Sequence, residues 1–264
     1  MRICSYRRDD GMVRAGIVEN GAVRDAGTTP WTPAAGELVG PLESVAILAP
    51  VPAPAKVVCV GRNYAEHAAE TGSEAPTEPQ LFAKWANAVV GPGVDVALPP
   101  ITKALDYEAE LVVVIGTTAR RVSEERALDH VFGYTCGNDV SARDLQFGDT
   151  QWTRGKALDT FAPTGPSIVT TDEIPDPQVL GIRCLVNGEP RQDDTTAHMI
   201  FSVARIIAFI TEAITLDPGD IIFTGTPSGV GVGRTPPTYL EDGDVVRVEI
   251  DRIGAIENRI VSIE

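Results

Sequence analysis

The sequence contains no run of about 18 apolar residues, and no basic segment precedes an apolar one near its start. These absences predict neither a membrane span nor a secretory signal peptide, so a cytoplasmic location is expected. Basic residues are also scarce, since 22 Lys and Arg stand against 37 Asp and Glu, for a formal net charge of −15. A chain this acidic is not expected to bind nucleic acid or an anionic membrane. It would also repel an acidic substrate, unless the pocket carries its own positive charge.

Cysteine is infrequent and scattered. Cys4, Cys59, Cys136 and Cys184 match neither a zinc-ligand spacing nor a small secreted disulfide framework. Reduced, mostly buried thiols are therefore expected. The 264 residues suffice for one large domain, or one domain with a small addition.

Helical patterns are few, and the chain from Val57 onward consists mainly of short β-type runs separated by Gly and Pro. Two segments predict helices: residues 123–134, with Ser123 as N-cap, and residues 199–215, which end before Pro218. This balance predicts a mostly β (α+β) protein with a closed or sandwiched β architecture.

The first residues read as a separate small unit. Asn20-Gly21 within an alternating stretch is a strong hairpin signal, and the proline-rich residues 49–56 resemble a connector. The sequence thus predicts a small N-terminal β module at residues 1–55 and a catalytic domain at residues 56–264.

One segment, DYEAELVVVIG at residues 106–116, places carboxylates directly before an apolar strand. The run 111–115 is unbroken and largely β-branched, which is typical of a strand covered on both faces. Asp106, Glu108 and Glu110 precede it at a spacing of two, so on a strand they point to one side. Unpaired, such carboxylates repel one another and are costly to desolvate.

A divalent cation would remove that cost, and oxygen-only ligands favour Mg²⁺, Mn²⁺ or Ca²⁺. Asp139, in GYTCGNDVSARDLQ, follows another short β-type run and is the candidate third ligand. The residues alone leave an alternative open. Because E-x-E is a common pattern, Glu108 and Glu110 could simply face solvent on an edge strand.

Several blocks, taken together and in this order, make residues 55–262 resemble the fumarylacetoacetate hydrolase family: GRNYAEHAAE, DYEAELVVVIG, GYTCGNDVSARDLQ, RGKALDTFAPTGP, MIFSVARIIAFI and PGDIIFTGTPSGVG. The resemblance implies a mixed β-roll catalytic domain with a small N-terminal β module, and a homodimer. It also implies a metal held by Glu108, Glu110 and Asp139, with Mg²⁺ expected first and Mn²⁺ or Ca²⁺ as alternatives. Asp106 is expected outside the ligand set, because the family motif uses only the E-x-E pair.

The resemblance further implies residue roles in a substrate pocket. Lys156 matches a family lysine that adds positive charge beside the 2-oxo oxygen of the substrate. The residues whose positions match family substrate contacts are Arg62, Tyr64, Lys84, Gln146, Gly225 and Thr226. Trp85 and Asn87 depart from the usual family residues, and Trp85 could either narrow the pocket or fill core.

His67 and Glu70 stand at i and i+3, which places both side chains on one face of a helical turn. A carboxylate beside an imidazole orients it and raises its basicity, as a general base requires. In hydrolytic members of the family such a pair activates water. The alternative is an exposed histidine on a polar helix.

The family's reactions share a metal-bound enolate of a 2-oxo acid, so the motifs leave several activities open. The first expectation is hydrolysis of the carbon–carbon bond of an acylpyruvate-type 2,4-dioxo acid, because His67 and Glu70 are both present. The alternatives are an isomerase or decarboxylase of aromatic-acid catabolism acting on a 2-hydroxyhepta-2,4-diene-1,7-dioate-like compound, and an oxaloacetate decarboxylase or tautomerase. A binding module without catalysis is a further alternative, which retention of the base, its carboxylate partner and Lys156 disfavours.

Overall fold

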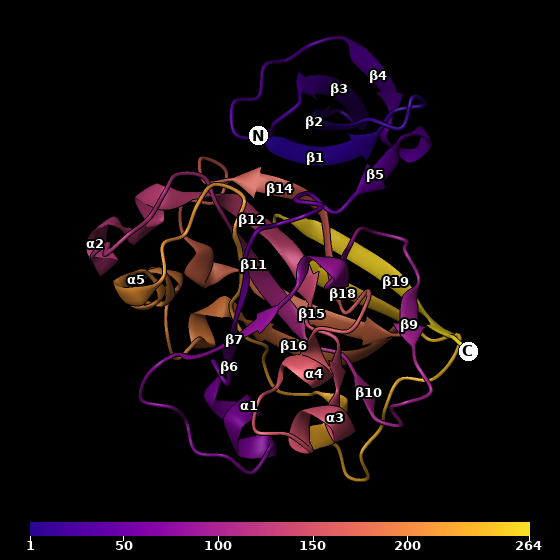
Figure 1. The fold of residues 1–264 in the computed structure, drawn as a ribbon, viewed down its shortest axis with the longest axis vertical. Coiled ribbons are helices and arrows are strands. Elements are labelled where there is room, and N and C mark those ends of the chain that lie inside the picture. Colours follow the sequence, from indigo (N-terminus) through magenta and orange to yellow (C-terminus); the bar gives the residue numbers. More distant parts are fainter.

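The computed structural model describes all of residues 1–264 and is built mainly from three β-sheets (Figure 1). The largest has twelve strands: β1 (Arg2–Arg7), β2 (Val13–Glu19), β3 (Ala22–Gly27), β4 (Leu38–Pro41), β5 (Ala46–Leu48), β6 (Val57–Gly61), β7 (Gln80–Lys84), β8 (Val89–Val90), β11 (Ala109–Ile115), β12 (Val131–Asn138), β14 (Ala162–Thr170) and β17 (Ile221–Phe223). Its main path runs β4-β3-β2-β1-β14-β12-β11-β17-β6-β7. The mostly β class predicted from the sequence is confirmed.

The other two sheets are smaller. Five strands form one of them: β9 (Val96–Leu98), β15 (Gly181–Val186), β16 (Glu189–Thr195), β18 (Val245–Ile250) and β19 (Gly254–Ser262). Two short strands form the other: β10 (Leu105–Asp106) and β13 (Ser141–Ala142).

Five α-helices complete the fold: α1 (Ala65–Glu70), α2 (Glu124–Ala127), α3 (Arg143–Phe147), α4 (Thr153–Lys156) and α5 (Val203–Ala213). Helices α1, α3 and α4 lie together at the end of the molecule opposite the N-terminal strands (Figure 1). None of the helices combines the length and the apolar character needed to cross a bilayer.

Strand β11 occupies the centre of the large sheet, paired with β12 on one side and β17 on the other. All seven of its residues are buried, and the apolar ones belong to the main hydrophobic core. The unbroken apolar run 111–115 explains this central position, because both faces of the strand carry apolar side chains that are stable only when buried.

The N-terminal strands β1–β5 form a lobe at one end of the molecule (Figure 1). The lobe has two small apolar clusters of its own, and β1 joins it to the rest of the sheet through β14. The predicted hairpin is confirmed, since Asn20 and Gly21 connect β2 to β3 with φ values of 50° and 74°. The boundary at residue 55 stays a prediction, because the sheet itself is continuous across the lobe.

One of the two predicted helices is mostly wrong. Within residues 123–134 only α2 is α-helical; a 3₁₀ turn follows, and β12 begins at Val131. Ser123 precedes α2 without making a side-chain cap. The ladders that β12 forms with β11 and β14 override the local helical pattern. The helix predicted over residues 199–215 is confirmed for its middle part: α5 covers Val203–Ala213, is capped by Ser202 and ends before Pro218.

Asp25 forms the main ion pair of the N-terminal lobe. Its carboxylate lies 2.5 and 2.7 Å from the Arg14 guanidinium and accepts the Tyr6 hydroxyl at 2.6 Å. Hydrogen bonding from Arg14 holds the pKa of Asp25 below its ordinary value, although partial burial opposes this. The stabilisation is therefore present above the ordinary carboxyl pKa and is lost as the pH falls through the native pKa.

We expect Asp25→Asn to lower Tm at pH 7 by roughly 2–4 °C, because one interaction of average strength is lost from a chain of this size. The difference in Tm between the variant and the wild type should narrow below about pH 3.9, where the carboxylate of the unfolded chain begins to be protonated while that of the native protein is still ionised. Thermal unfolding followed by circular dichroism between pH 3 and pH 7 measures both effects. A difference that does not change with pH would show that the charge of Asp25 is not what stabilises the lobe.

Candidate metal centre and active site

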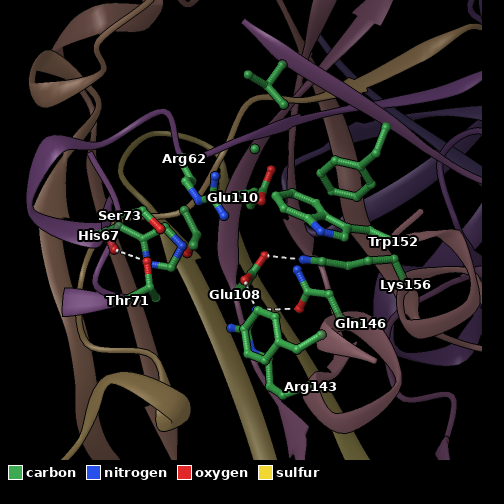
Figure 2. A pocket seen from close by; sticks show the side chains of 15 residues that line it. Arg62, His67, Thr71, Ser73, Glu108, Glu110, Arg143, Gln146, Trp152 and Lys156 are labelled. Atoms are coloured by element: carbon green, nitrogen blue, oxygen red, sulfur yellow. Dashed lines mark hydrogen bonds and ion pairs between the residues drawn. The ribbon is translucent and has the colours of Figure 1, made fainter. Parts of the chain in front are cut away.

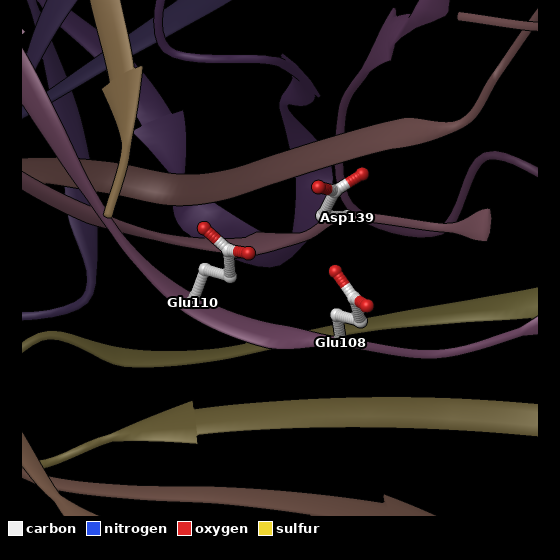
Figure 3. Close-up of side chains that lie close together, drawn as sticks. All are labelled: Glu108, Glu110 and Asp139. Atoms are coloured by element: carbon white, nitrogen blue, oxygen red, sulfur yellow. The ribbon is translucent and has the colours of Figure 1, made fainter. Parts of the chain in front are cut away.

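Glu108, Glu110 and Asp139 converge at one end of the central strands (Figure 3). Antiparallel pairing sets Ala109 opposite Asn138, and the Asp139 N–H donates to the Glu108 carbonyl at 2.9 Å. One oxygen of each carboxylate lies within 4.8 Å of the others, and all three residues are buried. The alternative that Glu108 and Glu110 face solvent on an edge strand is therefore wrong.

Three buried cations surround these carboxylates. The Lys156 ammonium lies 2.7 Å from Glu108 Oε2 and 2.9 Å from Asp139 Oδ2. Arg143 Nη1 lies 2.7 Å from Glu108 Oε1, and Lys84 Nζ lies 2.7 Å from Asp139 Oδ1. Positive charge therefore lies beside Glu108 and Asp139, whereas Glu110 has no cation within ion-pair distance.

This asymmetry sets the protonation of the two glutamates in opposite directions. Burial alone would raise the pKa of Glu108, but Lys156 and Arg143 hold it below its ordinary value. Burial, together with the negative charges of Asp139 and Glu108, raises the pKa of Glu110 well above its ordinary value. The positive charge of Lys156 and the Gly225 N–H, which lies 2.7 Å from Glu110 Oε2, offset this only in part. A bound cation would stabilise the ionised form of Glu110.

The residues fit a hard divalent ion. All donors in the cluster are carboxylate oxygens, the set that Mg²⁺, Mn²⁺ and Ca²⁺ prefer. Asp139 Oδ1 is buried and accepts no hydrogen bond. Lys84, although close to it, donates instead to the carbonyls of Val140, Lys156 and Phe161. Even with the Lys84 ammonium 2.7 Å away, that oxygen has a second lone pair with which it could bind a metal ion.

The charges of the whole buried group nearly balance. Asp106 is also buried and pairs with Arg143 at 2.8 Å, so four carboxylates face three cations. The formal charge is −1 before a metal binds, and a dication would change it to +1. The site could then attract an anionic substrate, despite the net charge of −15 on the whole chain.

A pocket opens over this centre, with Glu108 and Glu110 among its lining residues (Figure 2). Aromatic side chains form part of its wall: Phe82, Phe147 and Trp152. The polar and charged side chains that complete the lining are Arg62, His67, Thr71, Ser73, Arg143, Gln146, Lys156 and Thr226. Anionic and cationic groups thus meet in one cavity, as binding of both a metal and a carboxylate requires.

Helix α1 brings His67 to the pocket. His67 Nδ1 lies 2.8 Å from Glu70 Oε1, which leaves Nε2 as the ring nitrogen free to accept a proton. Glu70 Oε2 accepts the N–H of Gly229 at 2.9 Å, so the same carboxylate also ties α1 to the glycine-rich segment that contains Gly229, far along the chain. His67 is buried, and the alternative of an exposed histidine on a polar helix is therefore wrong.

The predicted substrate residues divide into two groups. Arg62, Gln146 and Thr226 line the pocket, whereas Tyr64, Lys84 and Gly225 do not. Arg62 adopts a left-handed φ of 56° and stacks on Trp152, with 5.2 Å between the guanidinium carbon and the ring centroid.

Some of the groups predicted to contact the substrate already make hydrogen bonds within the protein. The Gly225 N–H donates to Glu110, and the Thr226 hydroxyl donates to the Ala109 carbonyl at 2.9 Å. The hydroxyl of Tyr64 is buried without a partner. The substrate contacts of these three residues stay predictions, and the ammonium of Lys84 supports Asp139 from outside the pocket.

Arg143 is the main residue that the sequence analysis did not single out. It lies in the same block as Asp139 and Gln146, and its Nη2 is buried beside the pocket without a partner. An argument from charge could have predicted a second buried cation, because Lys156 alone cannot compensate the negative charge of three buried carboxylates. Trp152 and Phe82 were also missed, since an isolated aromatic residue gives no signal that distinguishes a pocket wall from core.

The family model described as fumarylacetoacetate (FAA) hydrolase C-terminal matches residues 56–261. The chain is 48% identical over 220 residues to an oxaloacetate tautomerase of Xenopus laevis, covering 83% of this chain and 69% of that protein. It is 47% identical to a human oxaloacetate tautomerase, covering 84% of this chain and 71% of that protein.

Solved structures match the entire fold. A 2-hydroxyhepta-2,4-diene-1,7-dioate isomerase from Mycobacterium marinum superposes with a TM-score of 0.86 and 41% identity, covering 99% of this chain and 98% of that one. A fumarylacetoacetate hydrolase from Exiguobacterium antarcticum gives a TM-score of 0.88 and 40% identity, covering both chains fully.

Proposed function

Because the chain belongs to the fumarylacetoacetate hydrolase family, an enzyme family, we propose that it is a tautomerase of 2-oxo dicarboxylic acids, with oxaloacetate as the first candidate substrate. The observation that carries this choice is the identity of 47–48% to oxaloacetate tautomerases over more than four fifths of the chain. The pocket supports it, because its base and its cations suit proton transfer within an anionic substrate.

The reaction moves one proton between C3 and the 2-oxo oxygen and breaks no carbon–carbon bond. His67 Nε2 is the proposed base that removes the C3 proton, with its ring oriented by Glu70. The resulting enolate carries negative charge on the former 2-oxo oxygen. Lys156 supplies positive charge at the pocket floor, where that oxygen would lie.

Glu108, Glu110 and Asp139 would hold the divalent ion, for which we propose Mg²⁺ or Mn²⁺. When bound, such an ion supplies a Lewis acid that polarises the 2-oxo group. A diacid also carries a second carboxylate, and Arg62 at the pocket wall provides a cation for it.

A second candidate is isomerisation of a 2-hydroxyhepta-2,4-diene-1,7-dioate-like compound. It is favoured by the isomerase structure, which covers 99% of this chain, including the N-terminal lobe. Both candidates would use the same base, and each passes through an enolate of its own 2-oxo acid. Acylpyruvate hydrolysis, the first expectation from the sequence, is less well supported. The tautomerases are 47–48% identical to this chain over the matched residues, whereas the fumarylacetoacetate hydrolase structure is 40% identical. The homodimer stays a prediction.

The deciding experiment supplies oxaloacetate, acetylpyruvate and 2-oxohept-3-ene-1,7-dioate to the purified protein with Mg²⁺ or Mn²⁺. We expect faster decay of the enol absorbance of oxaloacetate and, in D₂O, faster deuterium incorporation at C3 by NMR. Pyruvate is assayed in parallel, because hydrolysis of acetylpyruvate and decarboxylation of oxaloacetate both release it. Pyruvate release from acetylpyruvate without enhanced C3 exchange in oxaloacetate would favour the hydrolase and exclude the tautomerase.

A further inference from the structure

Asp106 is in phase with the E-x-E pair but lies outside the metal cluster. Strand β10 ends at Asp106 and β11 begins at Ala109, so the backbone is irregular between them. The carboxylate is fully buried and accepts hydrogen bonds on both oxygens. Oδ1 accepts the N–H groups of Tyr107 and Gly231, and Oδ2 accepts Val232 N–H and Arg143 Nε.

The contact with Arg143 connects Asp106 to the metal cluster. Arg143 Nε lies 2.8 Å from Asp106 Oδ2, and Nη1 of the same guanidinium lies 2.7 Å from Glu108 Oε1. Because the guanidinium is planar and rigid, holding one edge fixes the direction of the other. Asp106 also shares the positive charge of Arg143, which would otherwise be balanced by Glu108 alone.

The contacts with Gly231 and Val232 connect Asp106 to the segment 225–233, here called the glycine-rich loop. Three carboxylates hold backbone N–H groups of this loop: Glu110 at Gly225, Glu70 at Gly229, and Asp106 at Gly231 and Val232. The loop thus joins a candidate metal ligand to the helix that carries the proposed base. A Cβ at Gly231 would clash with the Thr238 carbonyl oxygen and would lie 2.6 Å from Asp106 Oδ1, so close packing here on both sides requires glycine.

We propose that Asp106 is a positioning residue, which aligns Arg143 against Glu108 and anchors the glycine-rich loop beneath helix α1. Loss of its charge leaves Arg143 bound more strongly to Glu108, which then becomes a poorer ligand for a metal. Loss of its hydrogen bonds to Gly231 and Val232 makes the glycine-rich loop more mobile, and this loop donates the Gly229 N–H to Glu70. The inference rests on the proposed metal centre, but not on the identity of the substrate.

The test compares Asp106→Asn with Asp25→Asn, which breaks an Asp–Arg pair in the N-terminal lobe, outside the pocket. Mn²⁺ is titrated into each substrate-free protein by calorimetry. We expect Asp106→Asn to weaken Mn²⁺ binding roughly 10–100-fold, the usual effect of removing a partner of a metal ligand. Hydrogen exchange of the loop amides should also accelerate in Asp106→Asn, and neither change should occur in Asp25→Asn.

An unchanged Kd for Mn²⁺ in a folded Asp106→Asn protein would overturn the proposal, as would equal effects in both variants. If Asp106→Asn does not fold, Arg143→Lys tests the same connection, because a lysine can reach only one of the two carboxylates. It should weaken Mn²⁺ binding to a similar extent, and an unchanged Kd would again overturn the proposal. If the wild type binds no Mn²⁺, the metal centre itself fails; if it binds Mn²⁺ but tautomerises no 2-oxo diacid, only the substrate assignment fails.

Discussion

Glu110→Ala is expected to lose metal binding and activity together while remaining folded. Glu110 is the one carboxylate of the cluster without a cation at ion-pair distance, and burial next to Asp139 and Glu108 raises its pKa. In the metal-free protein its charge is therefore unfavourable, and only a bound cation makes its ionised form stable. Removing it deletes a ligand without leaving a buried cation unpaired.

The expected loss of turnover is roughly 10³-fold or more, since a Lewis acid contributes several kcal/mol and each 1.4 kcal/mol is a factor of ten. EDTA should reduce wild-type turnover to a similar level, and added Mg²⁺ or Mn²⁺ should restore the wild type but not the variant. Glu249→Ala is a suitable control, because Glu249 pairs with Arg247 outside the pocket. Wild-type activity in excess EDTA, or normal metal affinity in Glu110→Ala, would contradict the metal centre.

Stability gives an independent measurement. A raised native pKa means that the contribution of Glu110 to stability is greatest when it is protonated at low pH and decreases as the pH rises through that pKa. In EDTA, the Tm of Glu110→Ala relative to the wild type should therefore improve with increasing pH. A relative Tm that decreases with pH would mean that the ionised Glu110 is stabilised by a group other than a metal.

The parts of the site that the sequence predicted are those whose geometry is local. A spacing of two on a strand makes Glu108 and Glu110 point to the same side, and a spacing of three on a helical turn does the same for His67 and Glu70. Both relations depend only on residues close together in the sequence. The structure places Glu108, Glu110 and His67 in the pocket lining, with Glu70 next to His67. The third carboxylate, Asp139, was only a candidate from its own segment and became a specific expectation through the family resemblance, because its proximity results from the pairing of β11 with β12.

The parts that the sequence did not reveal depend on contacts between distant segments. Lys84 was expected to contact substrate, but carbonyls from Val140, Lys156 and Phe161 capture its ammonium beside the pocket. Backbone carbonyls that lie far away in the sequence give no recognisable sequence motif near the lysine that they bind. The helix predicted up to residue 134 failed for the same reason, because the strands on either side of β12 determine its conformation.

His67→Ala is expected to separate the reactions that the metal centre alone cannot distinguish. Tautomerisation requires proton transfer at C3, where the proton is removed from the keto form or added to the enol form, and a positioned general acid or base contributes on the order of 10²–10⁴-fold. Turnover of enol oxaloacetate by the variant should fall by that factor. Decarboxylation breaks a carbon–carbon bond without removing a C3 proton, so any release of pyruvate from oxaloacetate should fall less.

The matched control is His198→Ala. His198 also pairs with a carboxylate, at 2.6 Å from Asp194, but it is 68% exposed and lies outside the pocket. Its loss should leave tautomerisation unchanged, whereas Glu70→Gln should reduce it, because a neutral amide no longer supports a protonated imidazole. The measurement is deuterium incorporation at C3 in D₂O, followed for all three variants at saturating Mn²⁺. If His67→Ala exchanges the C3 proton as fast as the wild type, the base is another group, and Glu70 serves only to tie helix α1 to Gly229 of the glycine-rich loop.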